Sequence, residues 1–132
     1  MIAVLDVSAT IEILLRREQG RLFSKVLSAA SWVVAPELYY AEISNVFWKY
    51  YRGKLVSHED SVNLAESGIA LVDTLVSGHE LWKESLAEGV KNGHSVYDMF
   101  YLVLARRNDA VLITMDQKLA TIATNMKIEL CH

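Results

Sequence analysis

Short unbroken apolar runs, separated by segments with helical spacing, constrain the fold of this chain more than any other feature. The runs stand at residues 2–5, 32–35, 69–72 and 110–114, and the segment 127–130 is expected to form a last edge strand. A short run without polar residues is typical of a strand that is covered on both faces, as in a parallel sheet. Strands that alternate with helices build helical layers around one such sheet. The pattern therefore predicts an α/β sandwich with a central, mostly parallel sheet of about five strands.

The segments between the runs carry apolar residues at helical spacing. Ser8 is the expected N-cap of a first helix, which ends near Gly20. Pro36 is expected at the first position of a helix that reaches about Tyr51 and stops at Gly53. The other helices are expected over residues 21–30, 57–68, 79–90, 96–107 and 117–125. No repeat or linker interrupts this pattern, so one domain is expected over residues 1–132.

The charge balance argues against a protein that coats nucleic acid nonspecifically. The chain has 13 Lys and Arg residues against 16 Asp and Glu residues, a formal net charge of −3. Binding through phosphate neutralisation usually requires a basic excess. Any nucleic acid would therefore have to be held locally, for example through a metal ion. Cys131 is the only cysteine, which excludes an internal disulfide framework and a cysteine-based zinc site.

The N-terminal residues and the hydropathy pattern predict a cytoplasmic protein. No basic segment precedes the first apolar run, and Asp6 interrupts that run, so a secretory signal is not expected. The longest uncharged apolar segment, 26–36, is shorter than the roughly 20 residues that a membrane helix needs. We therefore expect no membrane span.

Four acidic side chains stand where a solvent-exposed acid is not expected. Asp6 and Asp116 follow predicted strands, at the sheet edge where ligands bind in parallel α/β folds. Glu42 lies on an apolar side of its helix, and Asp98 interrupts a helix that is apolar nearly all round. A carboxylate in apolar surroundings is costly unless it is paired or bound to a metal. One divalent cation would serve all four acids.

The remaining acids fit ordinary positions. Glu37 is expected to complement a helix dipole. Asp73 follows a predicted strand in a weakly patterned region and is given no role. Asp6 has an alternative interpretation as a helix cap. The acids expected on exposed helix faces are Glu12, Glu18, Glu59, Asp60, Glu66, Glu80, Glu84 and Glu88.

Segments around the four unusual acids have the order and spacing of a known family. They are residues 4–8, with Ser8 two residues after the first acid; 36–46, with Asn45 three residues after Glu42; 97–105 around Asp98; and 112–119, with the pattern Thr-x-Asp-x-x-Leu. Together they resemble the PIN-domain nucleases, and in particular the small VapC-type toxins of prokaryotic toxin–antitoxin pairs. The resemblance covers essentially the whole chain and implies a PIN-like three-layer α/β/α sandwich.

The resemblance also implies a metal-dependent endoribonuclease. The residues it assigns to catalysis and to metal binding are Asp6, Glu42, Asp98 and Asp116. The residues expected to orient these carboxylates are Ser8, Asn45 and Thr114. Oxygen ligands without clustered His or Cys favour Mg²⁺ or Mn²⁺, which would polarise the scissile phosphate and activate a water molecule.

The partners implied are an RNA substrate, an antitoxin protein and a second copy of the chain in a homodimer. An antitoxin tail is expected in a groove beside the 39–51 helix, with a basic side chain directed toward the acids. The aromatic and basic residues 47–54 are interpreted as core packing plus a dimer or antitoxin groove, in preference to a base-stacking surface.

Two other functions stay open at this point. A non-catalytic PIN-like interaction module would keep the fold, although it has no need to hold four acids together. Residues 6–10 also resemble the Asp-x-Asp-x-Thr loop of haloacid-dehalogenase-type phosphatases, but Ser8 stands in place of the second Asp. His94, one helical turn before Asp98, is given no role. Arg106 and Arg107 are interpreted as complementing a helix C-terminus.

Overall fold

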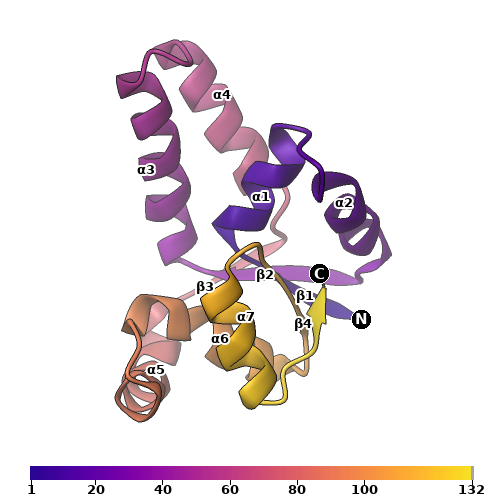
Figure 1. Cartoon of the computed structure of the whole chain (residues 1–132), viewed down its shortest axis with the longest axis vertical. Helices are drawn as coiled ribbons and strands as arrows, with labels where there is room; N and C mark the ends of the chain where they lie inside the picture. Colours follow the sequence, from indigo (N-terminus) through magenta and orange to yellow (C-terminus); the bar gives the residue numbers. More distant parts are fainter. Residues whose placement is uncertain (132) are drawn as a thin grey trace.

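A parallel sheet forms the middle layer of the computed structural model, which describes residues 1–131 (Figure 1). Its strands are β1 (Ile2–Leu5), β2 (Trp32–Pro36), β3 (Thr74–Val76), β4 (Val111–Ile113) and β5 (Leu130–Cys131). They lie in the order β3-β2-β1-β4-β5, and every neighbouring pair is parallel. The predicted parallel five-stranded sheet is therefore confirmed.

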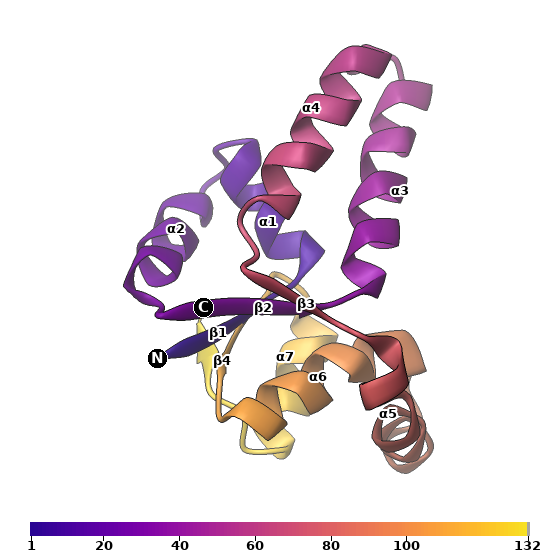
Figure 2. The same cartoon turned by 180° about the vertical axis from the view of Figure 1, so that it is seen from behind.

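Helices cover both faces of this sheet. On one face lie α1 (Val7–Leu14), α2 (Gly20–Ala29), α3 (Leu38–Arg52) and α4 (His58–Ile69), and on the other lie α5 (Gly78–Asn92), α6 (Val96–Asn108) and α7 (Gln117–Asn125) (Figures 1 and 2). The pair α3 and α4 extends far from the sheet as a helical hairpin. The predicted three-layer α/β/α arrangement is confirmed. Over residues 1–131, no helix combines the length and the apolar character needed to cross a bilayer.

The core lies where α6 crosses the middle of the sheet. This helix contacts β1, β2 and β4, and its residues 101–105 are buried. Burial on nearly all sides explains why its sequence lacks a polar face. The position of Asp98 in its first turn is therefore set by a well-packed element.

The predicted strand at residues 69–72 is wrong. Ile69 is the last residue of α4, and the strand stands at Thr74–Val76. Four apolar residues in a row do not distinguish a strand from a buried helix end. The last strand is also shorter and later than the predicted 127–130, because Lys127 has a φ of 60° after α7 and only Leu130 and Cys131 pair with β4.

Two helix starts also differ from the prediction. Asp6 caps α1 in place of Ser8, since its side chain accepts a hydrogen bond from the Ala9 N–H group. Pro36 does not open a helix but ends β2, so α3 begins at Leu38. The predicted stop of α3 at Gly53 and the predicted bounds of α7 are confirmed.

Candidate active site

The candidate site lies where the chain changes from one face of the sheet to the other. Strands β1 and β4 are neighbours, yet α1 leaves β1 toward one face and α7 leaves β4 toward the other (Figures 1 and 2). In parallel sheets, ligands bind outside the carboxyl ends of the strands at this switch point. Asp6 directly follows β1, and Asp116 stands at the start of α7 after β4.

Asp6 is buried and held by three hydrogen-bond donors. The Ser8 hydroxyl donates to Oδ1 at 2.7 Å, and the Ala9 N–H group donates to the same oxygen at 2.9 Å. The Thr114 hydroxyl donates to Oδ2. Each carboxylate oxygen carries about two acceptor sites, so one remains on Oδ2. The Asp6 carboxylate therefore has a fixed orientation and keeps acceptor capacity.

The two hydroxyls are themselves positioned by the loop after β4. The Met115 N–H group donates to Ser8 Oγ at 2.9 Å, and the Asp116 N–H group donates to Thr114 Oγ1 at 3.0 Å. This network ties the start of α1 to the β4–α7 loop. It places Asp6 and Asp116 in one rigid part of the sheet edge.

Asp116 caps α7 through one of its oxygens. Its Oδ1 accepts from the N–H groups of Lys118 and Leu119 at 2.9 and 3.1 Å. A capping carboxylate at a helix N-terminus is oriented by the backbone. Its Oδ2 makes no hydrogen bond with the residues that the structure describes, and it is available to a ligand.

Glu42 projects from α3 and meets Tyr101 of α6. The Tyr101 hydroxyl donates to Glu42 Oε1 at 2.5 Å. Tyr101 is buried and was not singled out by the sequence. The sequence did contain a signal that could have pointed to Tyr101: it lies in a helix expected to be buried, one turn after Asp98. A buried tyrosine hydroxyl usually needs a hydrogen-bond partner.

Asp98, in the first turn of α6, pairs with His94. The distance from His94 Nε2 to Asp98 Oδ2 is 2.7 Å. The four-residue spacing of His94 and Asp98 was visible in the sequence, but the sequence alone did not predict that the two side chains are in contact. Both side chains are partly exposed, at 22% for His94 and 31% for Asp98. Asp98 can therefore be reached from solvent.

The charges of the four acids interact. Burial raises the pKa of Asp6 to about 6, against hydrogen bonds from Thr114, Ala9 and Ser8 that lower it, and the Asp116 charge raises it further. Burial also raises the pKa of Glu42. The hydrogen bond from Tyr101 opposes that rise, and the charges of Asp6 and Asp98 add to it. The carboxylates thus form one group of like charges that affect one another.

The chemistry of this group fits a hard divalent cation. All four side chains offer oxygen donors, which suit Mg²⁺ and Mn²⁺. As the side chains stand, no three His, Cys, Asp or Glu residues within 1–131 are grouped closely enough to ligate an ion. Asp6 is fixed, whereas Glu42 and Asp98 are only partly buried and have room to adjust.

Asn45 lies apart from the hydrogen-bond network. It is exposed on α3 and lines a cavity of about 500 Å³ together with Glu42 and Tyr97. Its side chain donates to none of the four carboxylates in the described part of the chain. The role predicted for it stays a prediction, whereas Ser8 and Thr114 both contact Asp6.

Two acids that were expected on exposed faces, Glu88 and Glu12, are buried instead, and Glu84 is partly buried. Glu88 of α5 accepts from Arg106 Nη1 at 3.1 Å, and Glu84 accepts from Arg106 and Arg107 at 2.6 and 2.7 Å. These arginines therefore fasten α6 to α5, which the sequence did not indicate. Glu12, also buried, accepts from the N–H group of Gln19 at 3.2 Å.

Asp73 has a structural contact. Its carboxylate accepts from the N–H group of Val33 at 2.8 Å, and its own N–H group donates to the Val33 carbonyl at 2.8 Å. The pair joins the start of β3 to β2. Asp73 therefore stands outside the candidate site.

The sequence matches the model of the PIN domain family over residues 3–125. The chain belongs to the PIN domain family. Ribonuclease VapC3 of Pyrobaculum aerophilum is 29% identical over 119 residues, which cover 89% of this chain and 91% of that protein.

Solved structures agree with this PIN domain in fold. The protein PAE2754 from Pyrobaculum aerophilum superposes with a TM-score of 0.72 at 19% identity, covering 96% of this chain and 98% of that one. VapBC2 from Rickettsia felis, bound to a DNA fragment from their promoter, gives a TM-score of 0.68 at 14% identity and covers 99% and 98% of the two chains.

Proposed function

We propose that this PIN domain is a metal-dependent endoribonuclease and the toxin of a toxin–antitoxin pair. The observation that carries the proposal is the convergence of Asp6, Glu42, Asp98 and Asp116 on one sheet edge, with interacting charges. The 29% identity to a protein named Ribonuclease VapC3 supports RNA as the substrate class.

In this proposal, the four acids would hold Mg²⁺ or Mn²⁺, which would supply Lewis acidity toward a phosphodiester and lower the pKa of a water molecule. Ser8 and Thr114 hold the Asp6 carboxylate in one orientation. Tyr101 occupies Oε1 of Glu42 and leaves Oε2 free. Such supporting contacts position ligands and are expected to matter for activity.

RNA cleavage by the purified protein tests this proposal. We expect structured RNAs to be cut with Mn²⁺ or Mg²⁺, to stay intact with EDTA, and to stay intact with an Asp98→Asn variant. Glu129→Gln is the matched control, because Glu129 is exposed before β5 at the opposite edge of the sheet. Cleavage that Asp98→Asn leaves unchanged would show that the acids do not perform it.

The two alternatives are separated by the same assay. A non-catalytic interaction module would cut no RNA, whichever divalent metal ion is added. A haloacid-dehalogenase-type phosphatase would need an acid two residues after Asp6, but Ser8 stands there and its hydroxyl donates to Asp6. The geometry therefore favours the nuclease over the phosphatase.

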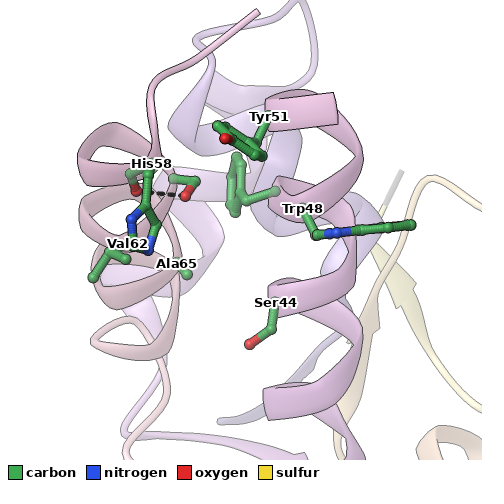
Figure 3. Close-up of a pocket in the computed structure, with 8 residues that line it drawn as sticks. Ser44, Trp48, Tyr51, His58, Val62 and Ala65 are labelled. Carbon is green, nitrogen blue, oxygen red and sulfur yellow. Dashed lines mark hydrogen bonds between the residues drawn. The ribbon is translucent and has the colours of Figure 1, made fainter. Parts of the chain in front are cut away.

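An antitoxin partner is part of the proposal. The α3–α4 hairpin lines an open cavity of about 430 Å³. In Figure 3, Ser44 and Tyr51 of α3 face His58, Val62 and Ala65 of α4 across this space. Trp48 and Tyr51 are about half exposed, at 49% and 52%. Exposed aromatic groups beside a cavity are typical of a protein-binding surface, which supports an antitoxin segment docking here.

The antitoxin is expected to place a basic side chain near the acids. Replacing Glu42, Asp98 and Asp116 together by their amides should then weaken antitoxin binding as well as abolish cleavage. Glu129→Gln is a better control than a change at Glu88, which is buried beside Arg106. Unchanged antitoxin affinity of the triple variant at several salt concentrations would show that inhibition acts through steric cover alone.

A homodimer is the third part of the proposal. Sedimentation equilibrium, which gives the mass of the protein in solution, tests whether the homodimer forms. We expect twice the mass of one chain, and a single-chain mass at micromolar concentration would contradict it.

A further inference from the structure

The corner between α1 and α2 carries a hollow with basic walls that the proposed active site does not use. Its volume is about 640 Å³, and its walls include Arg16, Arg17, Arg21, Glu18 and Ser24. Three arginines thus line it against one acid, on a chain whose net charge is −3. We call this feature the arginine hollow.

The corner that forms the arginine hollow is rigid. The Arg17 N–H group donates to the Glu12 carbonyl at 2.9 Å, and the Gln19 N–H group donates to the Glu12 carboxylate at 3.2 Å. Gly20 approaches Glu12 so closely that a Cβ atom would lie 2.3 Å from its carbonyl oxygen. The backbone therefore presents the arginines from fixed positions.

Among residues 1–131, the Arg17 guanidinium has partners, whereas those of Arg16 and Arg21 have none. Arg17 donates to the Tyr50 hydroxyl at 2.8 Å and lies 4.0 Å from the Glu12 carboxylate. Arg16 and Arg21 are exposed and make no side-chain hydrogen bond or ion pair with any residue in 1–131. They are available to an external anion.

Local structure does not account for both free arginines. Arg16 has a φ of 53°, a left-handed conformation that is unfavourable for a non-glycine residue. Its place after the end of α1 favours a cation, but Arg21 stands in the first turn of α2, where the helix dipole disfavours one. An anion in the arginine hollow would offset this accumulation of positive charge.

We propose that the arginine hollow binds phosphate groups of the RNA, away from the cleaved bond; this inference rests on the proposed function. Guanidinium groups suit phosphate because they donate paired hydrogen bonds. The eight residues of α1 span about 12 Å, with Asp6 at one end and the hollow at the other. The bond from Arg17 to Tyr50 joins the hollow to α3, the helix that carries Glu42.

Electrostatics explains why such a second contact is needed. The four acids repel a polyanion, and the chain has no overall basic excess. A local group of cations beyond the acids can hold the strand in register while its scissile phosphate lies at the acidic site. The arginine hollow is thus a positioning site for substrate.

The test compares two double variants that each remove two cations. Arg16→Ala with Arg21→Ala changes the hollow. Lys127→Ala with Lys83→Ala is the matched control, since Lys127 also has a left-handed φ, of 60°, and Lys83 is exposed on helix α5 in the opposite layer. Affinity for a short single-stranded RNA is measured by fluorescence anisotropy over a range of salt, with Asp98→Asn added to prevent cleavage.

Log affinity falls as log salt rises, with a slope of about −0.7 for each single-strand phosphate contact. We therefore expect the hollow variant, which loses two contacts, to show a shallower salt dependence, by about 1.4 in the size of this slope. In proteins with Asp98 intact, KM should rise about tenfold with kcat nearly unchanged, whereas the control pair should match wild type. Equal affinity, slope and KM for the two pairs would overturn the proposal. Absence of RNA cleavage by the wild type would instead overturn the proposed function, and the phosphate assignment with it.

A second arm tests the anion site without RNA. Inorganic pyrophosphate should raise the Tm of the Asp98→Asn protein and of the control pair, but not that of the hollow variant. A pyrophosphate effect combined with unchanged RNA affinity would show that the hollow recognises another anion, such as an acidic protein segment, and that RNA is the wrong ligand.

Discussion

Asp6 caps α1, which was one of the two interpretations that the sequence left open, and its metal-binding role is part of the proposal. Its Oδ1 atom caps α1 through Ala9, and its Oδ2 atom receives the Thr114 hydroxyl. Both contacts lower the pKa of the carboxyl, yet burial outweighs them. Without a cation, the ionised form of Asp6 therefore destabilises the fold.

This balance predicts that the metal-free protein loses stability as pH rises through about 6. The folded-state pKa of Asp6 is about 6, against an ordinary value of 3.8, so the folded state binds the proton more tightly than the unfolded chain. The stabilisation is complete below about pH 4 and is lost by about pH 6, a change of roughly 3 kcal/mol. Asp6→Asn should remove that part of the pH dependence. Urea unfolding in EDTA from pH 4 to 8 checks it, and parallel curves for the two proteins would contradict it.

The hydroxyl of Tyr101 is expected to support activity through Glu42. Tyr101→Phe removes the 2.5 Å hydrogen bond and leaves the partly buried Glu42 carboxylate without that donor. Loss of a contact of this kind typically lowers activity or metal affinity about ten- to a hundredfold. Cleavage rate and Mn²⁺ affinity are the measurements.

Tyr40→Phe is the matched control for this change. Tyr40 lies on α3, the helix that carries Glu42; it is 48% exposed, and its hydroxyl makes no hydrogen bond within residues 1–131. Equal activity of the two phenylalanine variants would show that Tyr101 only fills space.

Site residues were predictable from sequence where their environment was unusual. Asp98 was visible because it interrupts an apolar helix, and Asp6 because it follows a buried strand. The role of Tyr101 was not visible in the sequence, because a tyrosine fits a buried helix whether or not its hydroxyl contacts an acid on another element. The contact depends on α3 and α6 lying on opposite faces of the sheet and meeting at its edge.

Among the elements, the central strands were more predictable than the edge strands. Strands β1, β2 and β4 are covered on both faces and read as apolar runs. Strand β3 lies at one edge, and Thr74 in it is exposed, while the nearby apolar run at residues 69–72 belongs to the end of α4 and the turn after it. Edge strands bury less and so leave a weaker pattern.

The α1–α2 corner provides a test of element packing. Gly20→Ala would place a Cβ atom 2.3 Å from the Glu12 carbonyl oxygen, so the backbone must shift. We expect a loss of about 1–3 kcal/mol in the free energy of unfolding, measured by urea unfolding.

Gly53→Ala is the control for the corner. Its Cβ atom would lie 3.4 Å from the nearest oxygen, and its φ of −76° suits alanine. We expect a change within about 1 kcal/mol, or a small gain from a less flexible unfolded chain. Equal losses for the two variants would show that the corner is not tightly packed.

For the whole molecule, topology brings together acids that are far apart in the chain. Residues 6, 42, 98 and 116 come from four different helix starts on both faces of the sheet. Their convergence was predicted because Asp6 and Asp116 follow parallel strands, while Glu42 and Asp98 lie on apolar sides of their helices. The positions of the side chains at the sheet edge could not be predicted from the sequence, because they depend on contacts between elements. The same molecule separates an acidic edge from the arginine hollow beyond α1.

Calorimetric titration of Mn²⁺ into the metal-free protein tests most directly whether the four acids act as one metal site. We predict saturable binding to the wild type that weakens about tenfold or more in each of the variants Asp6→Asn, Glu42→Gln, Asp98→Asn and Asp116→Asn. Glu129→Gln should bind as the wild type does. The shared site would be contradicted if the wild type bound no Mn²⁺, or if all four amide variants bound Mn²⁺ as tightly as the wild type does.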